Sequence, residues 1–437
     1  MFDTIVALAT APIKSALAII RLSGDACFDV VSKVFTKNIT SCKTREIHYG
    51  YIVDDGKEID QVILLTYVNP HSFTGENSVE IICHGSPLIA DQIIKVLLKN
   101  GARLAGHGEF SSRAYLHGKI DLVQAEAIND VINATTEESK DLSMLALKGE
   151  NSALFKPIKE GIAEILASIE VNIDYPEYED IEEVSKEKVV TVCTNIINKL
   201  NALIEKGEKD KIYRDGIKIA IVGKPNVGKS SLLNAFLKED KAIVTPIAGT
   251  TRDIVEGEFS IEGVPVHLFD TAGLHESKDV IEQIGIDKAK AAVENADLIL
   301  FVVDNTGLDK DLYSFVRDKK HIVVYNKADL INDKKSDCLY ISALHNDVIP
   351  LIDKIKETMC IGELELKPSF NNTRQLGILK SIVFNLSNAI DDAKSDQPID
   401  LISTSILCAY NKALELLGES NKNDLSDEIF SRFCVGK

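Results

Sequence analysis

The sequence lacks the paired cysteines that zinc sites and redox dithiols use. Eight cysteines are spread over 437 residues, and no two of them form a CxxC pair. In a reducing compartment, isolated cysteines of this kind are expected to be small apolar residues of a core. A zinc site or a redox dithiol is therefore disfavoured.

A membrane-directed segment is also missing. Met1-Phe2-Asp3-Thr4 carries an acid where a secretory signal would carry Lys or Arg. The apolar stretch from Ala16 to Ile20 is too short to span a bilayer. We expect a cytoplasmic protein that has no membrane partner.

The sequence has no excess of positive charge, since its formal net charge is −18 at pH 7. This balance disfavours nucleic-acid binding by a broad basic surface, so an RNA partner must meet a local basic patch or be held by another protein. A GxGxxG fingerprint is absent as well, because Gly101, Gly106 and Gly108 do not fit it. A flavin or nicotinamide bound through a Rossmann site is therefore not expected.

The patterns that the sequence does contain predict several domains. Residues 1–117 mix short β-rich runs with turns and predict an α+β domain. From Asp121 onward apolar residues recur at helical spacing, and residues 118–210 predict a helical domain. The charged stretch 205–216 is interpreted as a linker. Strands alternate with helices over 211–366, as in a doubly wound α/β domain, and the helical pattern returns over 367–437. The α/β domain is therefore predicted to be inserted into a discontinuous helical domain.

The strongest motif is a phosphate-binding loop. Residues 223–230 read GKPNVGKS, which fits GxxxxGK followed by Ser or Thr, between a predicted strand at 217–222 and a predicted helix from Ser231. In such a loop the backbone amides wrap the phosphates, Lys229 reaches the β and γ oxygens, and the Ser230 hydroxyl binds Mg²⁺. The residues expected around the phosphates are Asn226, Val227, Gly228, Lys229, Ser230 and Ser231.

A second motif predicts that the base is guanine. Residues 326–329 read NKAD and follow a predicted strand at 321–325. Two hydrogen bonds from the ring N1–H and the exocyclic amine of guanine can reach the carboxylate of Asp329, and adenine cannot supply that pair. Asn326 and Lys327 complete this element. The segment expected to read the guanine O6 is Ser342, Ala343 and Leu344.

Two further segments fit the switch regions of a GTPase. Asp270 is expected to hold Mg²⁺ through water, and the amide of Gly273 to contact the γ-phosphate. Thr251 is the expected second hydroxyl ligand of Mg²⁺. The remaining members of these segments are Thr250, Thr271 and Ala272.

Catalysis needs a group other than the usual glutamine, because Leu274 follows this motif. Glu282 is our choice for indirect positioning of the attacking water, and the alternative is a surface acid. Asn226, with carbonyls of the stretch 245–250, fits a K⁺ that neutralises charge in the transition state, or it only stabilises its loop. Cys434 is either a buried cysteine at a helix end or an exposed thiol near an active site.

Over nearly its whole length the chain resembles the MnmE (TrmE) family of tRNA-modification GTPases. The likeness rests on the G motifs above and on matching segments elsewhere, which are Asp3–Ala7, Ile19–Gly24, Thr74–Glu76 with Glu80, His84-Gly85, Gly108–Ser111, Arg113-Ala114, Lys119, Asp121-Leu122, Gln124–Ile128 and Phe433–Lys437. The resemblance implies a Ras-like P-loop G domain and an N-terminal domain that forms a homodimer.

The resemblance also implies ligands that the spacings do not show. The N-terminal domain would bind a 5-formyl- or methylene-tetrahydrofolate through Arg21, Glu80 and Lys119, with Lys437 and Cys434 nearby. The K⁺ ligands would be Asn226, Thr245, Ile247 and Thr250, and Glu282 matches the catalytic acid of the family.

The function implied is that of a potassium-activated GTPase that needs GTP, Mg²⁺ and K⁺. With the flavoprotein MnmG (GidA), in a heterotetramer-type complex whose FAD lies on that partner only, it would modify certain tRNAs. The product would carry a (carboxymethyl)aminomethyl-type group on carbon five of the wobble uridine, built with a folate one-carbon unit. The alternative is a regulatory GTPase of ribosome assembly that makes no covalent RNA product.

Overall fold

The structure is a computed structural model. It describes residues 3–174, 185–239, 257–270, 293–305, 307–331, 335–336, 338–362, 364–420, 429–431 and 433–436. The chain divides into two compact units. Unit 1 comprises Met1–Asn129, Ala146–Ile197 and Ser381–Lys437, and unit 2 comprises Asp130–Leu145 and Asn198–Lys380.

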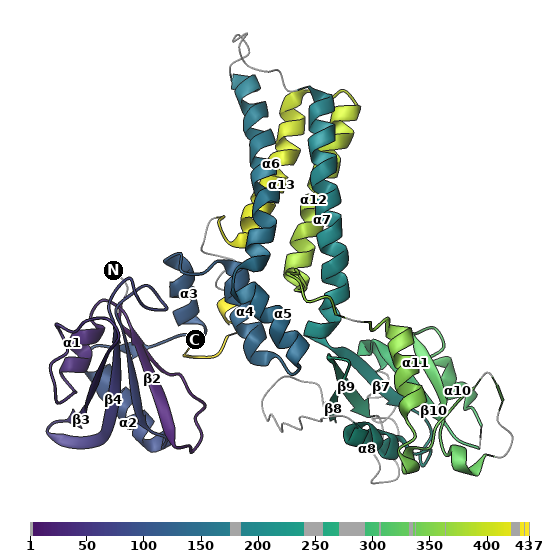
Figure 1. Ribbon diagram of the computed structural model, residues 1–437, viewed down its shortest axis with the longest axis horizontal. Helices are drawn as coiled ribbons and strands as arrows, with labels where there is room; N and C mark the ends of the chain where they lie inside the picture. The colour runs from purple at the N-terminus through teal and green to yellow at the C-terminus, as the bar shows by residue number, and fades with distance from the viewer. Residues whose placement is uncertain are drawn as a thin grey trace. The chain divides into compact units, whose positions relative to one another are not determined.

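Unit 1 begins with a six-stranded sheet in the order β3-β4-β5-β2-β1-β6 (Figure 1). The strands are β1 (Ile5–Leu8), β2 (Leu17–Ser23), β3 (Glu46–Asp54), β4 (Lys57–Tyr67), β5 (Ser78–His84) and β6 (Arg103–Leu104). The β1–β6 pair is parallel and the other pairs are antiparallel.

One face of this sheet is buried because apolar residues alternate along its strands. Ile20 and Leu22 of β2 and Ile81 of β5 are fully buried against helix α2 (Pro87–Lys99), and the small helix α1 (Cys27–Ser32) packs into the same core. Arg21 and Glu80 alternate with these residues and therefore lie on the opposite face. Helix α2 ends at Asn100, and Gly101 follows with φ +112°, a stop that the sequence predicts.

Further helices of unit 1 come after the sheet in the sequence. They include α3 (Glu109–Leu116) and α6 (Glu150–Asp174), which packs along α13 (Ile399–Leu417) as Figure 1 shows. An ion pair of 2.7 Å between Lys159 and Glu419 adds to this apolar contact. Helices α4 (Leu122–Asn133), α5 (Glu137–Leu147), α7 (Lys186–Asp215) and α12 (Thr373–Lys394) each have residues in both units.

The expectation of a linker at 205–216 is wrong, because α7 continues to Asp215. Three ion pairs at i,i+4 spacing join the charged side chains along the helix, among them Glu205 with Lys209 at 2.7 Å and Lys206 with Asp210 at 2.9 Å. Tyr213 is buried in the core of unit 2. A dense run of charges therefore builds a helical surface here.

Unit 2 contains a second six-stranded sheet in the order β12-β11-β10-β7-β9-β8, parallel except for the β8–β9 hairpin. Its strands are β7 (Ile217–Val222), β8 (Gly257–Ile261), β9 (Val264–Asp270), β10 (Leu298–Val303), β11 (His321–Tyr325) and β12 (Leu339–Tyr340). The helices beside it are α8 (Lys229–Glu239), α10 (Lys310–Ser314) and α11 (Ile349–Met359).

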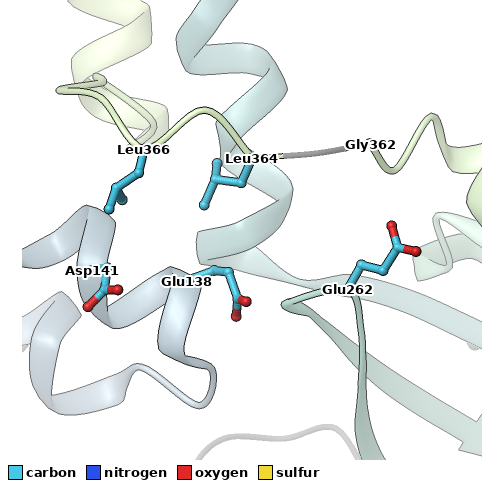
Figure 2. A pocket seen from close by; sticks show the side chains of 6 residues that line it. All are labelled: Glu138, Asp141, Glu262, Gly362, Leu364 and Leu366. Carbon is cyan, nitrogen blue, oxygen red and sulfur yellow. The ribbon is translucent and has the colours of Figure 1, made fainter.

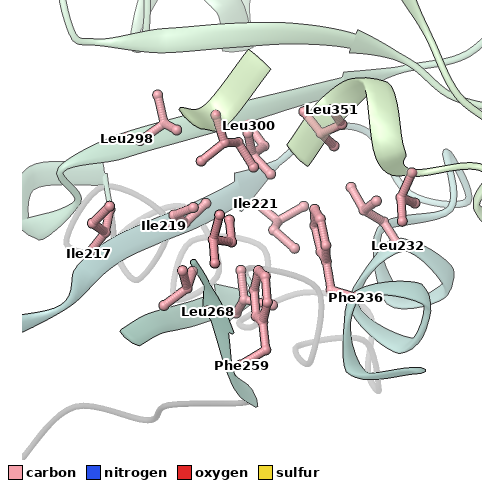
Figure 3. Close-up of a cluster of buried hydrophobic side chains, with 14 of the residues drawn as sticks. Ile217, Ile219, Ile221, Leu232, Phe236, Phe259, Leu268, Leu298, Leu300 and Leu351 are labelled. Atoms are coloured by element: carbon pink, nitrogen blue, oxygen red, sulfur yellow. The ribbon is translucent and has the colours of Figure 1, made fainter. Parts of the chain in front are cut away.

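Buried side chains fill both faces of this sheet. Figure 3 shows Ile219 and Ile221 of β7 packed near Phe236 of α8 and Leu351 of α11. Strand β10 is buried at every position, as expected for a central parallel strand covered on both faces. The α+β domain, the discontinuous helices and the inserted P-loop domain confirm the predicted fold class. In the part of the chain that the structure describes, no helix combines the length and the apolar character needed to cross a membrane.

Candidate nucleotide-binding site

The phosphate-binding loop follows β7 at the carboxyl end of the parallel strands, where ligands of such sheets bind. Gly223 must be glycine, because an added Cβ would stand 2.3 Å from the carbonyl oxygen of Val302 on β10. Asn226 and Gly228 have φ of 64° and 95°, so the loop turns through the left-handed region twice. The glycines thus let the loop close against the neighbouring strand.

Lys229 begins α8, and its side chain is buried. Its ammonium group donates to the carbonyl oxygens of Gly223 at 2.8 Å and Lys224 at 2.9 Å, so the lysine is held inside the loop. Ser230 and Ser231 are exposed in the first turn of α8. A buried cation, exposed hydroxyls and a helix N-terminus gather at one place, an arrangement that suits a phosphate chain.

Asn326 connects the loop after β11 to the phosphate-binding loop through hydrogen bonds. Its buried amide donates to the carbonyl oxygen of Val227 at 2.9 Å and accepts from the amide of Ala343 at 3.1 Å. A Cβ on Gly228 would stand 2.2 Å from its Nδ2. Three separate predicted segments therefore meet at one side chain.

Lys327 and Asp329 occupy the same loop with different roles. The ammonium group of Lys327 donates to the carbonyl oxygen of Asn226 at 2.7 Å and pairs with Asp304 at 2.9 Å. The exposed carboxylate of Asp329 accepts from the hydroxyl of Ser342 at 2.7 Å. An acceptor that is fixed yet open to solvent is what a guanine edge requires.

The structure leaves the switch residues untested. Asp270 ends β9 and pairs in register with Ile221, but its side chain lies outside the described part of the chain. Several other predicted residues lie outside the described residues altogether. These are Thr245, Ile247, Thr250, Thr251, Thr271, Ala272, Gly273, Leu274 and Glu282, with Lys437 at the chain end.

The candidate folate residues lie in unit 1. Arg21 of β2 is opposite Glu80 of β5 in the sheet register, and its guanidinium donates twice to that carboxylate, at 2.8 and 2.9 Å. The guanidinium also lies 5.8 Å from the ring centre of Phe110. Both charged side chains remain about one-fifth to one-quarter exposed. The pair is therefore formed and still open to a ligand.

The other candidates of this site differ in position. Lys119 is exposed in the loop after α3, where its Cε lies 3.4 Å from the Cβ that Gly75 lacks. Cys434 is exposed, and the carbonyl oxygen of Gly436, two residues later, accepts from Arg21 at 3.3 Å. Cys434 is therefore not the buried cysteine that one interpretation expects.

Sequence reasoning missed residues that have no motif of their own. Asp304, almost buried, holds the ammonium group of Lys327. Tyr67 is a second such residue. Burial raises the pKa of its hydroxyl above the ordinary value, and the nearby Glu80 carboxylate raises this pKa further. The one available signal for Asp304 is its place directly after the apolar strand β10, at the edge where the G motifs end.

Another hollow of unit 2 belongs to neither site. It is lined by Glu138, Asp141, Glu262, Gly362, Leu364 and Leu366 (Figure 2). Lys356 pairs with Glu262 at 2.6 Å and neutralises one of the three carboxylates. A hollow with carboxylates of like charge gives no reason to place a ligand in it.

Comparisons with known proteins fit this geometry. A family model described as "MnmE helical domain" matches residues 122–434, and one described as "GTP-binding protein TrmE N-terminus" matches residues 4–119. A protein of Ureaplasma parvum serovar 3 named "tRNA modification GTPase MnmE" is 40% identical, and the match covers 100% of each chain. This chain belongs to the MnmE (TrmE) family of tRNA modification GTPases.

Further relatives agree with this assignment. The protein of the same name from Ligilactobacillus salivarius is 38% identical and matches over 100% of this chain and 98% of its own. A solved structure of Era from Aquifex aeolicus bound to GDP.AlF4- is 32% identical over 38% of this chain and 65% of that one, at a TM-score of 0.26. At that TM-score the likeness adds nothing to the assignment. MnmE membership confirms the predicted GTPase class.

Proposed function

We propose that the protein is a potassium-activated GTPase that works with the flavoprotein MnmG (GidA) on certain tRNAs. The pair adds a (carboxymethyl)aminomethyl-type group to carbon five of the wobble uridine, with a tetrahydrofolate one-carbon unit. The main support is the meeting of the phosphate-binding loop and the NKAD loop at Asn326, in a chain that matches proteins named tRNA modification GTPases over their full length. Its tRNA substrate places the protein in the cytoplasm.

GTP binding follows from the contacts around the two loops. Lys229 exchanges its two carbonyl partners for oxygens of the β- and γ-phosphates, and the loop amides surround the phosphates. Asp329, fixed by Ser342, accepts from the guanine ring. The Lys327 bond to the Asn226 carbonyl oxygen keeps the base-reading loop and the phosphate-reading loop at a constant separation.

The exposed hydroxyl of Ser230, at the start of α8, fits Mg²⁺, which prefers oxygen ligands. We assign the remaining Mg²⁺ contacts to Thr251 and, through water, Asp270. Bound Mg²⁺ neutralises charge on the phosphates. Ser230 lies in the first turn of α8, directly after the loop that follows β7, and the backbone of Asp270 ends β9, the parallel neighbour of β7.

Asn226 fits a K⁺ site, because its side chain is exposed while its own carbonyl oxygen is already bound by Lys327. We assign Thr245, Ile247 and Thr250 as its companions. Bound K⁺ supplies positive charge beside the phosphates. Since Leu274 cannot orient a water molecule, we assign Glu282 as the acid that positions it indirectly.

The folate part of the proposal is supported by a partly open ion pair. Arg21 carries donors for a carboxylate or a pterin carbonyl, and Glu80 can accept from pterin N–H groups. Lys119 and Lys437 add positive charge for the glutamate end of a folate. A folate bound there carries the one-carbon unit, and this domain also forms the homodimer. Cys434 stands two residues before Gly436, whose carbonyl oxygen accepts from Arg21, and is assigned to the modification chemistry.

Two assays test the GTPase part. GTP turnover is measured in KCl and in NaCl at equal ionic strength, and we expect much faster turnover in K⁺. Equal rates would remove the potassium site. Glu282→Ala is expected to slow turnover while GDP affinity stays within about twofold of wild type, because the acid acts on water and not on the base. A matching loss of GDP affinity would assign Glu282 a structural role.

Mass spectrometry of wobble uridine in a strain without this protein tests the tRNA part. We expect unmodified uridine in that strain. Expression of the wild-type chain should restore the modification, and expression of Lys229→Ala should not. Normal uridine in the deletion strain would contradict the proposal. A ribosome-assembly defect together with normal tRNA would support the alternative function instead.

A further inference from the structure

The backbone on both sides of Cys434 is held by the loop that precedes α3. The ring of His107 donates from Nδ1 to the carbonyl oxygen of Phe433 at 2.9 Å. The amide of Gly108 donates to the carbonyl oxygen of Cys434 at 3.3 Å. His107 also forms an isolated antiparallel bridge with Val435. These contacts fix the main chain of Cys434 while the residue stays exposed.

Gly436, the second residue after Cys434, is fixed against β1 of the sheet. Gly436 has φ +98°, and an added Cβ would stand 2.6 Å from the carbonyl oxygen of Leu8, so glycine allows the close approach. Its own carbonyl oxygen accepts from Arg21, whose guanidinium also binds Glu80. The main chain of Cys434 is therefore held two residues from the contact with this ion pair.

The tail does not depend on His107 for docking. Phe430 and Phe433 are buried with Tyr115 and Leu122, and these rings anchor the tail by apolar contact. Gly108 has φ +60°, and a Cβ there would stand 2.6 Å from the carbonyl oxygen of Phe430. Docking and orientation thus come from different contacts, and His107 contributes to orientation.

We infer that His107 is a positioning residue that directs the Cys434 thiol toward a ligand bound at Arg21 and Glu80. The inference rests on the proposed function, because the ligand site and the role of Cys434 belong to it. A ring nitrogen that holds the preceding carbonyl restricts rotation of the peptide that leads into Cys434. Without this bond the carbonyl turns to water, and the thiol of a still-docked tail samples more directions.

The variants are His107→Ala, His107→Asn and, as a matched control, His71→Ala. Asparagine can place its amide donor close to where the Nδ1 of histidine stands, so it should restore the bond. His71 is an exposed histidine of the same domain. Because His107 is exposed, its replacement removes little buried surface, and GTP turnover and thermal unfolding of each variant confirm that the chain is folded.

The first readout is the alkylation rate of Cys434 by iodoacetamide, with and without 5-formyl-tetrahydrofolate. Peptide mass spectrometry gives this rate relative to the exposed Cys360 and Cys408 of the same chain. In wild type we expect the folate to change the Cys434 rate, and in His107→Ala we expect at least half of that change to be lost. His107→Asn and His71→Ala should behave as wild type.

The second readout is the rate of wobble-uridine modification by the chain with its flavoprotein partner and tRNA. His107→Ala should slow it about tenfold, since a displaced reacting group costs on the order of 10- to 100-fold. The folate Kd and GTP turnover should stay within about twofold of wild type. Full activity in His107→Ala, or a loss that His107→Asn does not restore, overturns the inference.

The two readouts separate this inference from the proposed function. If the wild-type chain modifies no uridine, the proposed function fails, whatever the alkylation rates. If wild type modifies uridine and the Cys434 rate responds to folate equally in wild type and His107→Ala, the positioning role of His107 fails alone.

Discussion

Replacing Arg113 with Met should destabilise the N-terminal sheet while leaving the G domain unchanged. Arg113 lies on α3, and its guanidinium is almost completely buried. It donates to both oxygens of Glu76 at 3.0 and 3.2 Å, to the Asp3 carbonyl and carboxylate, and to Glu109 at 2.8 Å. One side chain therefore ties α3 to the first residues of the chain and to the loop before β5.

The expected loss follows from the burial of Glu76, whose side chain is 4% exposed. Without Arg113 this carboxylate keeps the Ser23 hydroxyl at 2.7 Å and loses its cation. Breaking a buried pair from one side costs about 3–5 kcal/mol. That is a large part of the roughly 5–15 kcal/mol that holds a typical domain folded. The double variant Arg113→Met, Glu76→Gln should be less damaging than the sum of its single changes.

Arg103→Met is the matched control. Arg103 also contacts Asp3 and Glu109, but its side chain is 47% exposed. Exposed ion pairs contribute about 0–1 kcal/mol, so this variant should remain close to wild type. Hydrogen exchange of peptides from β2 and β5 measures the opening free energy of the sheet, and peptides from β7 and β10 serve as an internal reference. Equal opening free energies in Arg113→Met and Arg103→Met would refute the reasoning.

Three further predictions concern single residues. Asp304→Asn removes the carboxylate that holds Lys327, and a charged hydrogen bond is worth about 1.5–3 kcal/mol, so GDP affinity by calorimetry should fall roughly 10- to 100-fold. Gly228→Ala places a methyl 2.2 Å from Asn326 at φ +95°, and equilibrium dialysis should show at least about tenfold weaker GTP binding. Burial raises the pKa of Glu109, but hydrogen bonds from two arginines and a backbone amide outweigh it and hold the pKa at about 2. Because this pKa is lower than the unfolded value of 4.5, Glu109 stabilises the fold above pH 4.5 and loses that effect as pH falls toward 2, so in thermal unfolding Glu109→Gln should flatten the acid dependence in that window.

The phosphate-binding loop and the NKAD loop could be predicted because each is a short run tied to one local geometry. The strand before each loop is apolar, and its carboxyl end fixes where the loop lies. The bond from Lys327 to Asn226 joins residues that are 101 positions apart, and the motifs alone do not specify it. The sheet of the parallel strands brings the two loops together.

The pair in unit 1 shows where sequence reasoning stops. Arg21 and Glu80 meet because β2 and β5 are neighbours in register, and Gly436 joins them from 415 residues away. Composition and spacing do not predict such contacts. Arg21 and Glu80 are predicted as site residues only through the resemblance to a family. The high charge density of residues 205–216 led to the wrong prediction of a linker, because ion pairs at i,i+4 spacing stabilise the same residues as a helix. The roles of Thr251 and Glu282 stay predictions.

Nucleotide competition tests the central claim most directly. Full-length protein bound to a fluorescent GDP analogue is titrated with unlabelled GDP and, separately, with ADP. The account predicts that GDP displaces the probe and that ADP does so only at concentrations on the order of 10⁴-fold higher, because adenine lacks the pair of donors that guanine offers to the Asp329 carboxylate, which Ser342 fixes. Displacement by ADP at concentrations close to those of GDP would contradict the account.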